Sequence, residues 1–316
     1  GGRPCAGGGG GVGWVWGGSA PPRAAPPPGA TPGTLPELPV QYADWQHARL
    51  ASGKLQDTVD YWRDRLAGAP ARLELPTDRP RPPTQSYRGA VEHCHLDREL
   101  LGDVHALARE SGATLFMVLL AAWIVVLSRR SGTEDLTIGT PVAGRPALEM
   151  EPLIGFFANT LVLRVSTAGS PSFRELTDRV RTVTMDGFAH EEMPFEQLVE
   201  VLQPERSLSH SPLFQHMFIL QNTPTEGFAL PGLSTGALTE DCPDGLRAGL
   251  EYATDLYARD TAERLLDEWR TVLRVAVAAP DTPVDRLPLL SPARCADEGW
   301  DRGPWSGCTS SALRSW

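Results

Sequence analysis

Two runs of alternating apolar residues constrain the fold of this chain most. A loop that contains Pro and Gly separates them. The first run begins at Asp135 and the second ends at Arg164. Apolar residues alternate in each run with smaller or polar ones, which predicts two strands. Arg145 and Asn159 lie at the inner ends of these strands, where a buried scaffold can present polar groups to a ligand. The alternative is structural, with Asn159 capping a bend and Arg145 in solvent.

Helical and strand-like patterns alternate on both sides of these runs, which predicts an α/β fold. Helices are predicted at about 55–67, from an Asp97 cap to Gly112, at about 114–130, from 170–175 onward, at 194–202 and at 260–278. Further strands are predicted at about 87–96, 212–220 and 246–252. Pro194 is placed at the first position of its helix, where its missing amide is no loss.

The 316 residues can form one large domain or two small ones. Residues 1–36 are rich in Gly and Pro and are expected to be disordered, because they cannot bury enough apolar surface to offset their ordering entropy. Residues 37–290 carry the periodic patterns and form the predicted domain. Residues 291–316 have no periodicity and are predicted to be a tail. The chain begins at Gly1 without an initiator Met or an export leader, which suggests a piece of something longer or imperfect gene calling.

Composition disfavours several classes of function. The 39 acidic residues exceed the 29 basic residues, and the resulting net charge of -10 argues against a nucleic-acid groove. The longest apolar run, from Leu115 to Leu127, is shorter than the roughly 18–20 residues of a membrane span, so no membrane partner is expected. The five cysteines are far apart and show no Cys-x-x-Cys spacing. Reduced thiols and a cytoplasmic location are therefore expected.

Patterns for catalysis and metal binding are weak in this chain. His93 and His95 lie on one face of a predicted strand, with Cys94 opposite. Two histidines could begin a metal site, but a third ligand is missing, so an ordinary edge-strand face is favoured and no metal is assigned. The sequence contains no Gly-x-Ser-x-Gly elbow, P-loop or His-Glu-x-x-His motif. No catalytic residue is therefore assigned.

Five segments in family order resemble the condensation domain of nonribosomal peptide synthetases. They are Tyr42–Trp45, which is shortened, Thr137–Arg145, Ile154–Arg164, His190–Glu196 and Arg206–Leu213. Glu191 and Glu192 replace the Gln and Asp of the family, and Ser207 and His210 are further departures. The family's His-His-x-x-x-Asp-Gly catalytic motif is absent from this sequence. The chain therefore resembles the C-terminal lobe of the domain.

The resemblance implies an incomplete chloramphenicol-acetyltransferase-like lobe with an α+β sandwich fold. Its parent would join a carrier-tethered acyl or peptidyl thioester to a carrier-tethered aminoacyl amine, forming an amide. The implied partners are carrier domains, an adenylation domain and the missing N-terminal lobe. No cofactor is expected to bind directly, since phosphopantetheine arrives on the carriers. The chain is expected to be inactive alone. A non-catalytic carrier-docking remnant and an epimerisation domain are the alternatives, and Asn159-Thr160 disfavours the second.

The resemblance also assigns roles to residues. Arg145, Asn159 and Thr160 are expected to line the substrate tunnel, and Arg145 would lack its usual aspartate partner. Structural roles are expected for Gly155, Phe157, Arg164, His190, Pro194, Phe195, Glu196, Arg206, Ser209 and Pro212. Direct substrate roles for Glu196 and Arg206 are disfavoured.

Two further expectations concern the sheet and its surface. The family usually has another strand near Leu238, and its pattern is not visible in this sequence. An apolar seam around Phe156, Phe157 and Leu161 is expected to be exposed when the other lobe is missing, which would promote aggregation.

Overall fold

The structure, a computed structural model, describes residues 13–17, 46, 48–49, 52–53, 55–145, 157–205, 207–221 and 245–291. For residues 13–17 it defines the backbone alone. Several sequence-based predictions therefore lie outside the described residues. These are the motif at 42–45, the region near Leu238, the tail after 291, Gly155, Phe156 and Arg206.

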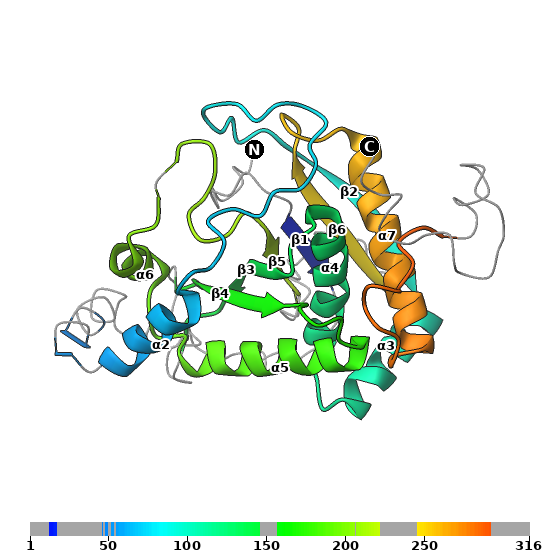
Figure 1. Cartoon of the computed structure of the whole chain (residues 1–316), viewed down its shortest axis with the longest axis horizontal. Coiled ribbons are helices and arrows are strands. Elements are labelled where there is room, and N and C mark those ends of the chain that lie inside the picture. The colour runs from blue at the N-terminus through cyan, green and yellow to red at the C-terminus, as the bar shows by residue number, and fades with distance from the viewer. Residues whose placement is uncertain are drawn as a thin grey trace, which may run out of the picture.

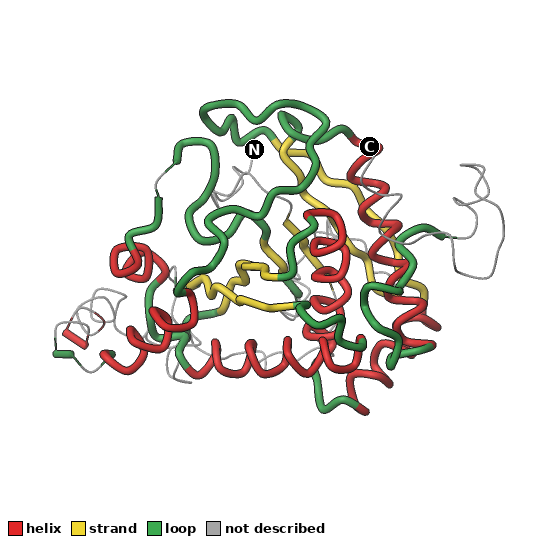
Figure 2. Tube along the Cα trace, viewed as in Figure 1, coloured by secondary structure: helices red, strands yellow, loops and turns green. Residues whose placement is uncertain are grey.

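A mixed sheet with helices packed against it forms the centre of the molecule, which confirms the predicted α/β class (Figure 1). Its six strands lie in the order β2-β6-β1-β5-β3-β4. The strands are β1 (Gly13–Gly17), β2 (Gly89–Asp97), β3 (Asp135–Val142), β4 (Asn159–Ser166), β5 (Met217–Phe218) and β6 (Gly245–Ala253). The helices are α2 (Gln56–Leu66), α3 (Arg98–Glu110), α4 (Leu115–Ser131), α5 (Phe173–Ala189), α6 (Phe195–Leu202) and α7 (Arg259–Ala278). Helix α4 lies between α5 and α7, and a long loop crosses the upper side of the sheet (Figure 2).

Helix α4 is the core of the molecule. Every residue from Met117 to Leu127 is buried, because α3, α5, α7 and the sheet surround this helix. The Thr114 side chain caps its first turn, and Gly132 ends it in the left-handed conformation. Among the described residues no single helix is long and apolar enough to cross a membrane. Helices α3 and α4 satisfy the length and composition criteria only together, as a pair bent by 104°.

One buried ion pair joins α4 to α7. Glu268 of α7 is 1% exposed, and its carboxylate accepts a hydrogen bond from Arg130 Nε over 2.8 Å. A second hydrogen bond from Arg130 Nη2 makes the contact bidentate. The fork geometry of the guanidinium satisfies both carboxylate oxygens, which is the condition under which a buried pair is tolerated.

The Pro-rich segment between α2 and β2 is fastened along its length, although it has no regular secondary structure. Leu73 N donates to the buried Gln215 Oε1 over 2.8 Å. Asp78 Oδ2 accepts a hydrogen bond from Ala258 N over 2.7 Å, and Asp78 Oδ1 accepts one from Thr261 Oγ1 over 3.0 Å. The N-cap residue of α7 forms no side-chain cap of its own. The cap of α7 is therefore supplied from 180 residues upstream in the sequence.

Three elements differ from the sequence-based predictions. The strand predicted at 212–220 is limited to β5, because Leu213 has a φ of 67° and Phe214 N turns back to bond Pro212 O over 2.8 Å. Pro194 is the N-cap of α6, one position before the place predicted, because its ψ of 139° is extended.

The third difference is β1, which lies inside the stretch predicted to be disordered. Residues 13–17 pair with β6 on one side and β5 on the other. The prediction averaged composition over 1–36, and this average hid a five-residue segment of strand-forming Trp and Val between two glycines.

His216, immediately before β5, is buried, and neither of its ring nitrogens has a hydrogen-bond partner. Burial, and to a smaller extent the charge of Arg81, lowers the pKa of His216 from 6.5 to about 3. Between these two values the unfolded chain binds a proton that the folded chain does not bind. The free energy of unfolding therefore falls as the pH drops below 6.5.

We expect His216→Leu to reduce this acid sensitivity. The free energy of unfolding of wild type should lose about 1.4 kcal/mol per pH unit more than that of the variant below pH 6.5. Urea unfolding between pH 7.5 and 4.5 measures both slopes. The matched control is His105→Gln, at an exposed position of α3. Parallel slopes for wild type and His216→Leu would contradict the prediction.

Candidate functional site

The candidate site is built around the turn at residues 190–195, where α5 ends and α6 begins. Asn159, the first residue of β4, uses its whole side chain to hold this turn. Its Nδ2 donates to the carbonyl oxygens of Glu191 and Met193, each over 2.8 Å. Its Oδ1 accepts hydrogen bonds from Thr160 N over 2.8 Å and Phe195 N over 3.0 Å. Both amide hydrogens are therefore engaged within the chain, and Asn159 positions the turn.

The other side of the turn is held by α2 and the residues before it. The Tyr61 ring stacks on the His190 ring, with 3.8 Å between ring centroids and 4° between ring planes. Trp62 Nε1 donates to His190 O over 3.1 Å. Arg49 forms a bidentate ion pair with Glu192, with the shortest N–O distance at 2.7 Å. The turn is therefore held from β4 and α2, which are distant from it in sequence.

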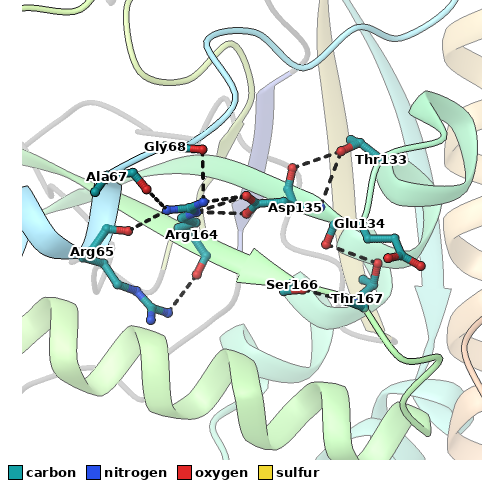
Figure 3. A network of polar contacts seen from close by, with 10 residues as sticks. Arg65, Ala67, Gly68, Thr133, Glu134, Asp135, Arg164, Ser166 and Thr167 are labelled. Carbon is teal, nitrogen blue, oxygen red and sulfur yellow. Dashed lines mark hydrogen bonds and ion pairs between the residues drawn. The ribbon is translucent and has the colours of Figure 1, made fainter.

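At the other end of β4, Arg164 fastens the C-terminus of α2 to the sheet (Figure 3). Its Nη2 lies 2.7 Å from Asp135 Oδ2 on the neighbouring strand β3. Its guanidinium also donates to the final carbonyls of α2 and the residues after it. These are the oxygens of Arg65, Ala67 and Gly68. A cation at a helix C-terminus compensates the partial negative charge of its free carbonyls.

The loop after β3 folds back on the chain that enters β4. Arg145 Cζ lies 4.4 Å from the centroid of the Phe157 ring, within cation–π range. Gly144 has a φ of +61°, and a Cβ at this position would lie 1.9 Å from Phe157 O, so only glycine fits. The expectation of an exposed apolar seam is wrong for two of its three residues. Phe157 and Leu161 are buried, because the loop and α5 cover them, and Phe156 is not described.

The electrostatics of the turn raise the pKa values of two side chains. Burial, and then the charge of Glu192, raises the pKa of the Glu191 carboxyl. Burial also raises the pKa of Tyr61. His190 Nδ1 contacts the backbone oxygen of Asp186 at 2.8 Å. Within the described ranges no histidine ring is hydrogen-bonded to a carboxylate. The hydrogen bonds of Asn159 therefore orient the chain segments that meet at this turn.

The histidines of β2 form no metal site in the structure. His93 and His95 face the backbone of β6, opposite Gly249 and Arg247 in the register. No group of three or more metal-ligating side chains occurs among the described residues.

The sequence matches the condensation-domain family over residues 30–297. The chain belongs to the condensation-domain family. One of the linear gramicidin synthase proteins of Brevibacillus parabrevis is 44% identical over 275 residues, covering 81% of this chain and 5% of that protein. The probable non-canonical nonribosomal peptide synthetase CymA of Salinispora arenicola is 45% identical over 282 residues. The match covers 80% of this chain and 4% of that protein. A solved complex of the X-domain and OxyB from teicoplanin biosynthesis matches with a TM-score of 0.73 at 27% identity. The match covers 83% of this chain and 62% of that chain. This chain is therefore shorter than its relatives and spans less than two thirds of the X-domain chain.

This condensation domain places its remaining family-motif residues near the turn or in the loop before β5. Thr160 is half-buried on β4, and Glu196 is exposed in the first turn of α6. The Phe195 ring lies 5.5 Å from that of Phe214. Ser209 accepts a hydrogen bond from Arg81 through its carbonyl, and Pro212 O accepts one from Phe214 N. The structural roles expected for these residues stay predictions. The predicted tunnel-lining roles of Arg145, Asn159 and Thr160 stay predictions.

Sequence reasoning missed three features of the condensation-domain site. The Arg49–Glu192 pair joins residues 143 positions apart, and no local pattern reports such a contact. The helix predicted at about 55–67 does not name the acceptor of the Trp62 indole N–H, which the structure shows to be His190 O. The stacking partner of His190, Tyr61, precedes Trp62 on the same helix and gives no separate signal.

We expect Arg164→Lys to loosen α2 selectively. Lysine lacks the guanidinium group, which donates to Asp135 and to the carbonyls at the end of α2 at the same time. About 1–2 kcal/mol of stabilisation should therefore be lost. Hydrogen exchange of the α2 amides should become about tenfold faster, while α4 is unchanged. Arg179→Lys is the matched control, since Arg179 donates to two exposed carbonyls, those of Ser166 and Ala168. Equal α2 exchange in both variants would count against this role.

Proposed function

We propose that this chain is one part of the amide-forming site of a nonribosomal peptide synthetase condensation domain. The observation that carries the proposal is the family match over 30–297, together with relatives at 44% and 45% identity. The substrates are an acyl or peptidyl thioester and an aminoacyl amine, each tethered through phosphopantetheine to a carrier domain. An adenylation domain is the further partner.

The proposed reaction is aminolysis of the thioester. The amine nitrogen attacks the thioester carbonyl carbon, the C–N bond forms and the C–S bond breaks. The thiol of the donor carrier leaves, and a base removes the amine proton. This sequence has no His-His-x-x-x-Asp-Gly motif, and the described histidines have no carboxylate partner. We therefore assign the base to another polypeptide segment and expect the chain alone to be inactive.

A complementation assay tests this proposal. The purified chain is mixed with a separately produced condensation-domain N-terminal lobe that carries the catalytic motif, and with two carriers loaded with aminoacyl groups. Dipeptide on the acceptor carrier is measured by mass spectrometry. Turnover should require both polypeptides and should be lost when the second motif histidine of the added lobe is changed to alanine. Turnover by the chain alone would overturn the proposal.

A second candidate is a non-catalytic docking domain. The X-domain of teicoplanin biosynthesis, which is similar to this chain, is solved in complex with another protein, OxyB. The same mixture distinguishes the two functions. Binding of loaded carriers without dipeptide in the presence of a competent N-terminal lobe supports docking.

A further inference from the structure

Strand β1 comes from a part of the chain that the condensation-domain match does not include. The match begins at residue 30, and β1 consists of residues 13–17. All other strands of the described sheet lie inside the match. Even so, β1 occupies an interior place in the sheet, between β6 and β5 (Figure 1).

The pairing of β1 joins two groups of strands. Five positions pair antiparallel with β6, from Gly13 opposite Glu251 to Gly17 opposite Arg247. Two positions pair parallel with β5, where Gly13 and Trp14 lie opposite Met217 and Phe218. On one side β6 continues to β2, and on the other β5 continues to β3 and β4. In the described chain these two groups share no other strand pairing. Within the residues that the structure describes, the sheet is therefore continuous only through β1.

The residue types of β1 suit an inserted strand. Trp and Val favour extended backbone, and glycines stand at both ends. A long segment rich in proline separates it in sequence from α2. Closing a long loop adds little entropy cost beyond that of a shorter one, so such a tether permits insertion over a distance.

We propose that the space between β5 and β6 is a strand-acceptor site, filled by residues 13–17 of the same chain. The ligand class is an extended peptide that runs parallel to β5 and antiparallel to β6. Main-chain hydrogen bonds to both neighbours supply the recognition, as in other cases of strand addition. This inference does not depend on the proposed function, because it concerns the completion of the sheet.

A disulfide trap tests the register directly. Trp16 lies opposite Ala248, so their Cα atoms are about 4.5–5.5 Å apart, which suits a disulfide. Trp16→Cys with Ala248→Cys should form an intrachain disulfide on oxidation, identified by peptide mass mapping. The five native cysteines are first replaced by alanine, because Cys94 also lies opposite Ala248. The control is Trp16→Cys with Leu250→Cys, two positions out of register, which should not crosslink.

The outcomes of the trap are decisive. An intrachain 16–248 disulfide that forms at any protein concentration supports the proposal. A disulfide between two chains, or no disulfide under conditions that oxidise free thiols fully, overturns it.

A proline variant tests whether insertion stabilises the neighbouring strands. Val15→Pro removes an amide from an interior strand, where proline is not accommodated. Amide exchange of 217–218 and 246–250 should become at least about tenfold faster, while α4 stays protected. Ala24→Pro, in the same Pro-rich stretch but outside β1, is the control and should leave exchange unchanged. Unchanged exchange in Val15→Pro would overturn the proposal, and the disulfide trap does not depend on the stability of this variant.

Discussion

Replacing Asn159 with aspartate should destabilise the domain at least as much as replacing it with alanine. Aspartate has nearly the shape of asparagine, but it cannot donate to the oxygens of Glu191 and Met193, which lie 2.8 Å from Nδ2. Its charge would instead face two carbonyl oxygens at hydrogen-bond distance. Losing two hydrogen bonds and adding this repulsion should cost about 3 kcal/mol, because the two part-buried acceptors lose their donor.

Thermal unfolding measures this effect. A loss of that size corresponds to a melting temperature about 6–12 °C lower for a domain of this length. Thr182→Ala, at an exposed position of α5, is the control and should change the free energy of unfolding by less than about 0.5 kcal/mol. An Asn159→Asp protein as stable as wild type would show that the turn at 190–195 does not need the amide.

Replacing Glu268 with leucine should give a loss of similar size for a different reason. The substitution leaves the Arg130 guanidinium, 20% exposed, without the carboxylate that it contacts. Removing one partner of a buried pair typically costs about 3–5 kcal/mol, and partial access of Arg130 to water places the expected loss near the lower end. Urea unfolding at pH 7 measures it.

The double variant gives the sharper test. Glu268→Leu with Arg130→Met removes both charges of the pair and should unfold within about 1 kcal/mol of wild type, because neither charge is then left without the other. Asp60→Ala breaks the exposed pair with Arg63 and should cost less than about 1 kcal/mol. Additive losses in the double variant would show that the two side chains do not act as a pair.

The local sequence pattern was sufficient to predict those helices and strands whose ends and buried faces are determined by nearby residues. The apolar run at 115–127 is the buried helix α4, and the predicted cap at Asp97 is confirmed. The runs before Arg145 and after Asn159 are strands, as alternation predicted, and the structure pairs them antiparallel. Periodicity reports these features because it reflects one face of one element.

Features that depend on distant contacts could not be predicted in this way. The sequence pattern predicted that Asn159 and Arg164 lie on one strand. It did not predict the four hydrogen bonds of Asn159 or the α2 carbonyls that Arg164 binds. The positive φ of Leu213, which shortens β5, is imposed by surrounding structure and is unusual for leucine. The place of β1 between β5 and β6 depends on backbone pairing with distant strands, which its local Trp and Val pattern does not report.

The attachment of the Pro-rich segment has a consequence for changes in chain length. Loops without secondary structure usually accept added or deleted residues. In this segment Leu73 is bonded to Gln215, and Asp78 is bonded at the first turn of α7. The two anchor residues, Leu73 and Asp78, are close together in the sequence. One residue added or removed between these points would shift Asp78 by about 3.3 Å, which exceeds the reach of a hydrogen bond. Homologous loops are therefore safest to exchange here as whole segments, with the spacing between the two anchors preserved.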